Sequence, residues 1–401
     1  MDFGFTEEQE RLRKEIHDFY VNELPEDFEP DWGTSKEVQS FYLQLQKKAG
    51  AKGYLTPGWP KEYGGLGLGD IDQGVVNEES YSWEVNWPNH IGSRQAGPAT
   101  ILFGTEEQKK RFLPPITRGE VIWHQAFTEP DAGSDEANMQ LRAVEDGDDY
   151  IFNGQKVFIS GIYKPNYLLT EVRTMDITPK HRGLSLFLVP ADTSGITFRP
   201  LPSMSFGLQN EIFFDDVRVS KEYLLGELNR GFYHAMAVFS FERSGTGWPA
   251  IHRRRLQEFV HFCKEEKRNG KPLIEDPEVR KALAQMAVEM EVWRLLAWHG
   301  QWWSSQRKKL GPKPYDVAGF FQKTFFTRHA EVMMNILGFY GQLKKGSKWA
   351  KLMGWIERQW QETRSLHAAG TFEIRKVVLA QRGLGLPRPP RPSAAKAEEK
   401  Q

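Results

Sequence analysis

The sequence predicts an α+β protein in which a helical part, a β-rich part and a second helical part follow one another. Apolar residues recur at helical spacing before about residue 120 and again after Gly231. Short β-branched and aromatic runs, bounded by glycine or proline, fill the stretch between them. The 401 residues suffice for several substantial cores. We expect the parts at residues 1–122, 123–232 and 233–388, with a disordered tail at 389–401.

The first helix is expected to begin after Thr6, because a threonine hydroxyl can cap a helix start. Its apolar face should consist of Leu12, Ile16 and Phe19. Loops at 25–33 and 57–69, both containing proline and glycine, interrupt the helical pattern that follows. The first part should therefore be a set of helices joined by irregular segments.

The β-forming runs of the middle part begin near residue 150. They are Tyr150–Phe152, Val157–Ile159, Tyr167–Thr170, Leu184–Val189 and Ile212–Phe214. Turn residues bound these runs, so we expect an antiparallel sheet or a small barrel.

The last part regains helical periodicity. Asp276 before Pro277 predicts the start of a long helix. The buried face of that helix should carry Val279, Leu283, Met286, Met290, Trp293 and Ala297. Two prolines in 311–314 should end it, and another helix should follow from Tyr315.

Composition excludes several classes of function. Lysine plus arginine equals aspartate plus glutamate, at 53 each, so we expect neither nucleic acid nor an anionic membrane as a partner. The single Cys263 excludes an intrachain disulfide and a cysteine-based metal cluster, and we expect no metal. No secretory signal and no run of about 18–20 apolar residues is visible, so we expect a soluble, cytoplasmic protein.

Two polar turns, 127–135 and 153–160, supply clustered backbone N–H groups, short hydroxyls and one aromatic ring. These groups suit a flat, anionic redox cofactor. Thr128 and Ser134 add hydroxyls that can donate to a heterocycle carbonyl or a phosphate. The alternative reading of 127–135 is a surface loop shaped by its aspartates.

These two turns and several later segments resemble the acyl-CoA dehydrogenase family of flavoproteins. The other matching segments are Gly58–Gly65, Gly104–Lys109, Phe213–Val219, Phe241–Arg243, Ala369–Arg375 and Ala380–Pro387. Each is weak alone, but together they keep the family's order from Phe5 to about Arg388. The resemblance implies an N-terminal helical domain, a central antiparallel β domain and a C-terminal four-helix bundle, assembled as a homo- or hetero-tetramer.

The resemblance also implies FAD-dependent α,β-dehydrogenation of an acyl-CoA thioester, with electrons passed to an electron-transferring flavoprotein. By resemblance, Thr128 and Ser160 hydrogen-bond the flavin edge and Ser134 reaches the CoA moiety. Phe158 takes the place where relatives commonly have a tryptophan beside the ring, although on its own it also reads as a buried strand aromatic. The C-terminal motif adds the cofactor-binding candidates Thr371 and Glu373.

The catalytic base is expected at Glu242. Many members carry a glutamate before the Gly-Thr of the C-terminal motif, where this chain has Ala369. The branch that includes isovaleryl-CoA dehydrogenase instead carries it on a helix just before an arginine, as in Glu242–Arg243. Arg243 is then a substrate-binding candidate, and burial should raise the pKa of Glu242. The alternative is a solvated Glu–Arg pair.

Other residues near the reacting atoms qualify this expectation. The backbone N–H of Ala369 can still donate to the thioester oxygen, because that role needs no carboxylate. His367 is a possible substitute base. Two glycines and Pro249 follow Glu242 and should kink the chain there, which changes the direction of the Glu242 side chain.

Two contacts to the dinucleotide differ from the family pattern. Relatives reach the neighbouring subunit's FAD pyrophosphate with an arginine, and the nearest candidate here is Arg268, in an offset register. The usual glutamine before a Gly-Gly turn is Asn335, which precedes Gly338. We therefore expect FAD to bind with a partly different adenine end.

The acyl group stays open to branched, cyclic and dicarboxylic classes. Arg94 falls where relatives line the acyl pocket; it forms either a surface ion pair or a contact with a distal carboxylate or sulfinate. Two alternative functions also remain. One is elimination from an activated acyl-CoA, such as desulfination, and the other is a flavin-binding subunit that supports a catalytic partner in a heterotetramer.

Overall fold

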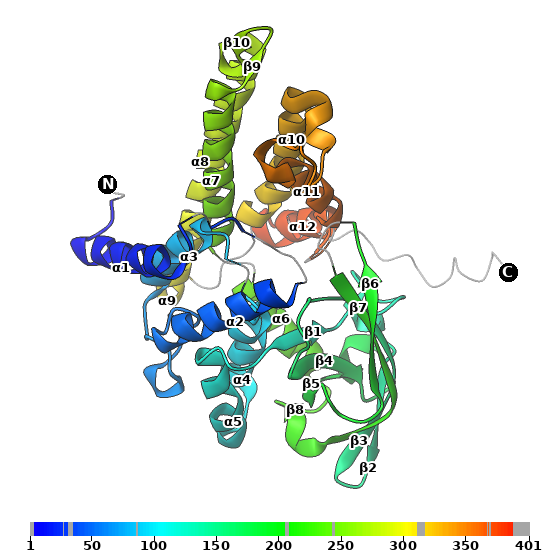
Figure 1. The fold of residues 1–401 in the computed structure, drawn as a ribbon. Coiled ribbons are helices and arrows are strands. Elements are labelled where there is room, and N and C mark those ends of the chain that lie inside the picture. The colour runs from blue at the N-terminus through cyan, green and yellow to red at the C-terminus, as the bar shows by residue number, and fades with distance from the viewer. Residues whose placement is uncertain are drawn as a thin grey trace, which may run out of the picture.

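The computed structural model has three successive parts, as the sequence predicts (Figure 1). It describes residues 4–26, 28–30, 35–85, 87–204, 208–242, 245–310, 317–366, 368 and 370–387. The predicted tail at 389–401 lies outside these residues. None of the described helices is both long and apolar enough to cross a lipid bilayer.

Helices make up the N-terminal part. They are α1 (Glu7–Glu23), α2 (Lys36–Ala51), α3 (Asp70–Ser82), the π-helical turn η2 (Gly92–Ala96), α4 (Gly97–Phe103) and α5 (Glu106–Thr117). Thr6 caps α1 as predicted, because its hydroxyl accepts from Gln9 N at 3.2 Å and the Gln9 side chain accepts from Thr6 N at 3.0 Å. Ile16 and Phe19 of the predicted apolar face are buried.

A mainly antiparallel sheet makes up the middle part. Its strands are β1 (Trp123–Ala126), β2 (Arg142–Asp146), β3 (Asp149–Ser160), β4 (Tyr167–Arg173), β5 (Leu184–Pro190), β6 (Ile196–Pro202), β7 (Leu208–Ser220) and β8 (Leu224–Leu225). Within the described residues, the strand order is β6-β7-β3-β2-β4-β5-β8, with β1 beside β4. The β1–β4 and β2–β4 pairs are parallel, which the expectation of an antiparallel sheet did not include.

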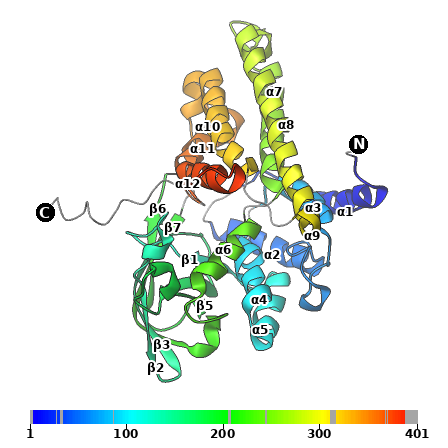
Figure 2. The ribbon, with the colours of Figure 1, turned by 180° about the vertical axis from the view of Figure 1, so that it is seen from behind.

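The C-terminal part is again helical. Its elements are α6 (Gly231–Glu242), α7 (Gly247–Glu265), β9 (Lys267–Arg268), β10 (Lys271–Pro272), α8 (Pro277–Ser305), α9 (Arg307–Leu310), α10 (Val317–Leu337), α11 (Trp355–Glu362) and α12 (Phe372–Val378). Asp276 caps α8 through Glu278 N, and all six residues predicted for its buried face are buried. In Figures 1 and 2, α7 and α8 form a long hairpin that projects away from the sheet.

Helix α6 connects the sheet to both helical parts. It packs on β5 on one side and on α4 and η2 on the other. Ala235 and Val238 of α6 share one hydrophobic core with residues of α5, β1 and β5. Figure 2 shows α6 between the sheet and α4. Because Glu242 ends α6, the predicted base stands where the three parts meet.

Candidate active site

The turn at 127–135 is anchored to β3 by a buried ion pair. Lys156 Nζ lies 2.8 Å from Glu129 Oε1, and the side chains of these residues are 0% and 6% exposed. The Lys156 ammonium also donates to Phe127 O at 2.9 Å, and Val157 N donates to Thr128 O at 2.8 Å. The backbone around Thr128 is therefore fixed against β3, so this pair positions the predicted flavin-binding turn.

The described hydrogen bonds of the Glu129 carboxylate lie within the turn region and its neighbours. It accepts from Gln140 N at 2.5 Å and from Leu141 N at 2.9 Å, in addition to Lys156. Burial lowers the pKa of Lys156, and the nearby Glu129 opposes that shift. Burial also raises the pKa of Glu171 on β4 well above its ordinary value, and the nearby Lys156 opposes that shift.

Phe158 is not a buried strand aromatic. The residue is 56% exposed, and its φ of 58° lies in the left-handed region, which is rare for a residue with a side chain. The register between β3 and β7 shifts between Lys156 and Ile159, so a bulge in β3 turns the ring away from the sheet core. This outward ring fits the position predicted beside a flavin.

Replacing Phe158 by glycine is expected to change the free energy of unfolding by less than about 1 kcal/mol. Relief of backbone strain, roughly 1–3 kcal/mol, offsets the entropy that glycine adds to the unfolded chain. The buried Phe152 on the same strand is the control, and Phe152→Ala should cost about 3–5 kcal/mol. Thermal unfolding and bound-flavin content measure both variants. A loss above about 2 kcal/mol for Phe158→Gly would show that the ring stabilises the core.

Three predicted hydroxyls are available to a ligand. Thr128 is half-buried, and Ser134 and Ser160 are exposed. Among the described residues, none of these hydroxyls has a hydrogen-bond partner. They lie on the turn and on the end of β3 that the Lys156–Glu129 pair joins. Free donors beside an outward aromatic ring are the groups that an isoalloxazine edge requires, so the residues present fit FAD.

The helix that carries Glu242 also contacts the turn. Phe239 of α6 packs against Phe127, with ring centroids 5.8 Å apart. Glu242 lies three residues further along α6 and ends that helix; its side chain and Arg243 lie outside the described part. The predicted break is present between α6 and α7, where Gly245 and Thr246 are not helical. Pro249, however, does not kink a helix: it lies in the first turn of α7, where proline costs no backbone hydrogen bond.

The segment before α12 is held by a buried lysine. The ammonium of Lys323 on α10 donates to Leu366 O and, at 3.0 Å, to Ala368 O. The predicted thioester contact, Ala369, follows directly and lies outside the described residues, as does His367. Lys323 is a residue that the sequence did not single out, because a lone lysine in a helical pattern reads as a solvated side chain.

Thr371 and Glu373 lie at the start of α12. The Thr371 hydroxyl accepts from Ile374 N at 3.2 Å and so caps the helix. Glu373 is exposed in the first turn. A capping hydroxyl keeps its own O–H to donate, so the cofactor-binding role of Thr371 stays a prediction, as does that of Glu373.

The two altered dinucleotide contacts lie together, far from the turn at 127–135. Arg268, at the tip of the α7–α8 hairpin, donates to Ile336 O, next to Asn335. Asn335 and Gly338 are exposed at the end of α10. In Figure 1 this tip and the sheet lie at opposite ends of the molecule. Residues of one chain that are this far apart cannot contact the same flavin ring.

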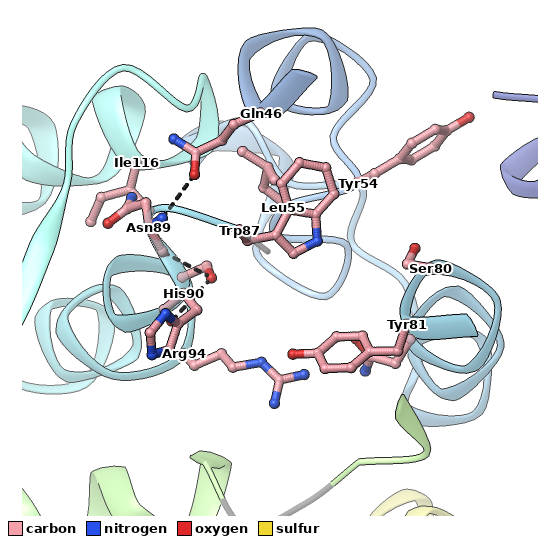
Figure 3. A pocket seen from close by; sticks show the side chains of 12 residues that line it. Gln46, Tyr54, Leu55, Ser80, Tyr81, Trp87, Asn89, His90, Arg94 and Ile116 are labelled. Carbon is pink, nitrogen blue, oxygen red and sulfur yellow. Dashed lines mark hydrogen bonds between the residues drawn. The ribbon is translucent and has the colours of Figure 1, made fainter. Parts of the chain in front are cut away.

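Arg94 does not form the expected ion pair with any described carboxylate. Its guanidinium carbon lies 4.9 Å from the centroid of the Tyr81 ring, and the residue is half-buried. It comes from η2 and, with Tyr81 of α3, lines a pocket within the N-terminal helical part (Figure 3).

Comparison with known proteins decides the family. Models of the acyl-CoA dehydrogenase N-terminal, middle and C-terminal domains match residues 6–120, 125–217 and 229–384. Acyl-CoA dehydrogenase FadE26 of Mycobacterium tuberculosis is 32% identical over 398 residues, covering 97% of this chain and 99% of that protein. The chain belongs to the acyl-CoA dehydrogenase family. It is therefore an FAD-dependent oxidoreductase that acts on acyl-CoA thioesters.

Solved structures of acyl-CoA dehydrogenases have the same fold. The ChsE4–ChsE5 complex from Mycobacterium tuberculosis has a TM-score of 0.86 at 30% identity, covering 97% of this chain and 100% of that chain. A structure described as the Tcur3481–Tcur3483 steroid ACAD has a TM-score of 0.88 at 29% identity, with the same coverage. The predicted order of helical, β and helical domains is confirmed, as is the FAD cofactor.

Proposed function

We propose that Glu242 removes the α-proton of a saturated acyl-CoA as it is oxidised to the 2-enoyl-CoA. The contact between Phe239 and Phe127 carries this proposal, because it brings the end of α6 to the turn that presents Thr128. A base must lie near the acidic carbon, and Glu242 is three residues from that contact.

Other residues of the chain orient the thioester and the cofactor. FAD, when bound by Thr128, Ser134, Phe158 and Ser160, supplies the acceptor for the hydride from Cβ. The backbone N–H of Ala369 donates to the thioester oxygen, where negative charge develops as the α-proton leaves. Lys323 supports this role, since it holds the carbonyl oxygen of Ala368, the preceding residue.

The electron acceptor and the location complete the proposal. An electron-transferring flavoprotein fits the family as the acceptor that returns the enzyme to its oxidised state. A cytoplasmic location remains the prediction made from the sequence. The substrate screen is anaerobic bleaching of the yellow flavin by linear, branched, alicyclic and dicarboxylic acyl-CoAs. If no class of ester bleaches the flavin, the proposed function is wrong.

We also propose a tetramer in which the hairpin tip of one chain reaches the dinucleotide of a neighbour. The ChsE4–ChsE5 relative is a complex of two different chains, so the neighbour is either a copy of this chain or a homologous partner. Arg268 stands at an exposed tip beside Asn335, and this position suits a contact across subunits.

Replacing Arg268 by glutamine is expected to weaken FAD binding by roughly 10- to 100-fold, because it removes one hydrogen bond to a charged group. Lys271→Gln, an exposed change on β10 of the same hairpin, is the control and should leave FAD affinity unchanged. The holoenzyme is used together with any chain that co-purifies with it. Ultrafiltration separates free from bound flavin and so measures the FAD affinity of each variant. Equal affinity in both variants would reject the contact across subunits.

A further inference from the structure

We propose that the pocket around Arg94 binds a carboxylate at the far end of the acyl group. The inference rests on the proposed function, since it names the class of acyl-CoA that the site accepts. The pocket lies among α2, α3, η2 and the segment between α3 and η2 (Figure 3). Its polar lining includes Gln46, Asn77, Ser80, His90 and Ser93.

Among the described residues that line this pocket, Arg94 alone has a charged side chain. No aspartate or glutamate is among the residues that line it. No described carboxylate lies within ion-pair distance of the guanidinium, whose described partner is the face of Tyr81 at 4.9 Å. A half-buried arginine with no carboxylate partner among the described residues has hydrogen-bond donors to offer, and a planar carboxylate satisfies such donors in pairs.

The other polar groups favour an anion as well. Reduced solvation and the charge of Arg94 lower the pKa of His90, which lines the pocket. His90 is therefore neutral near pH 7 and adds no second charge. The buried Ser80 hydroxyl lies beside the Tyr20 hydroxyl and has no other hydrogen-bond partner among the described residues. Ser80 is thus a neutral polar group in the wall of the pocket.

The pocket lies beside the chain that follows the predicted base. Arg94 Nη2 is 4.0 Å from the position that a Cβ on Gly245 would occupy. A Cβ on Gly247 would lie 2.5 Å from Tyr81, so α7 starts directly against that ring. Gly245 is three residues beyond Glu242. An acyl chain that passes Glu242 can thus reach Arg94 with its far end.

The size of the pocket suits a terminal group. Its volume is about 40 Å³. One water molecule needs roughly 10–15 Å³ of such a cavity, so the pocket has room for about three waters or one carboxylate. It is far too small for a whole acyl group. A methyl end placed there would leave Arg94 desolvated without a partner, so the pocket also selects against neutral chains.

Binding of 2-enoyl products tests the pocket without turnover, because these products are not reduced by the oxidised enzyme. The probes are the CoA esters of 2-hexenedioic and 2-hexenoic acid, which differ only in the terminal carboxylate, and the matched pairs with eight and ten carbons. Titration calorimetry with the FAD-loaded protein gives a ratio of Kd values for each pair. In at least one pair, we expect the wild type to bind the acid-tipped ester roughly 10- to 100-fold more tightly, as for a hydrogen bond to a charged group.

Two variants and one control complete this test. Arg94→Met should bring the ratio to about one, and Arg94→Lys should give an intermediate value, because lysine keeps the charge but loses the planar fork. Arg199→Met, an exposed arginine on β6 paired with Glu211, should keep the wild-type ratio. Equal losses for both esters in Arg94→Met would overturn the proposal, since Arg94 would then act on Glu242 or on the fold.

The outcomes separate this inference from the proposed function. If no saturated ester bleaches the flavin but the Arg94-dependent ratio persists, the proposed reaction is wrong and the carboxylate site stands. If methyl-ended esters bleach the flavin and every wild-type ratio is near one, the reaction stands and the carboxylate site is wrong.

Discussion

Replacing Glu242 by glutamine is expected to slow flavin reduction by roughly 10²- to 10⁴-fold, the range for loss of a general base. Glutamine has nearly the same shape as glutamate but cannot accept the α-proton. The variant should therefore remain yellow and still bind CoA esters. Anaerobic stopped-flow mixing with the best substrate of the screen measures the rate, and calorimetry measures binding.

Glu265→Gln is the matched control. Glu265 is an exposed carboxylate at the end of α7, and its loss should leave the rate unchanged. Glu242→Asp keeps a carboxylate but withdraws it by one methylene, so its rate should fall between those of wild type and Glu242→Gln. A near-normal rate in Glu242→Gln would assign the base elsewhere, with His367 as the next residue to replace.

Replacing Lys156 by methionine is expected to destabilise the protein by roughly 3–5 kcal/mol, because it leaves the Glu129 carboxylate buried without its partner. The variant also loses the bond to Phe127 O, so the turn that presents Thr128 should loosen and FAD content should fall. Scanning calorimetry of the holoenzyme and flavin absorbance give the two measurements.

The double variant Lys156→Met with Glu129→Gln should recover part of the loss, because neither member of the pair then carries a buried charge. Lys221→Met is the control on the same sheet. It breaks the exposed pair with Glu145 and should cost no more than about 1 kcal/mol. If Lys156→Met were as mild as Lys221→Met, the buried pair would not anchor the turn.

Local patterns predicted much of this fold. The cap at Thr6 and the start of α8 at Pro277 depend on residues within three positions, and both are present. The buried face of α8 follows from the helical repeat alone. The break after Glu242 follows from the glycines beyond it.

Contacts between distant residues were not predictable in the same way. Lys156 and Glu129 are 27 positions apart, and a charged residue in a strand or turn normally faces solvent. The parallel β1–β4 pair depends on how the chain crosses the sheet, which no local pattern encodes. The outward ring of Phe158 needs a bulge with positive φ, for which the sequence offers no glycine.

The polar pocket illustrates the same limit at the candidate site. The place of Arg94 in the sequence allowed two interpretations, a surface ion pair or a residue of the acyl pocket. The choice depends on which side chains of α2, α3 and η2 line the pocket, and these elements come together only in the fold. The sequence therefore named the residue but not its surroundings.

The π-helical turn that carries Arg94 suggests how the selectivity of this site could change during evolution. Gly97 N bonds to Gly92 O, five residues back, so this turn holds one residue more than an α-helical turn. Deleting one codon there would let the segment close as ordinary α-helix and would rotate the residues ahead of the deletion by roughly 100° about the axis. We expect homologous proteins to gain or lose selectivity for esters with a terminal carboxylate through such changes in length, while the rest of the fold stays the same.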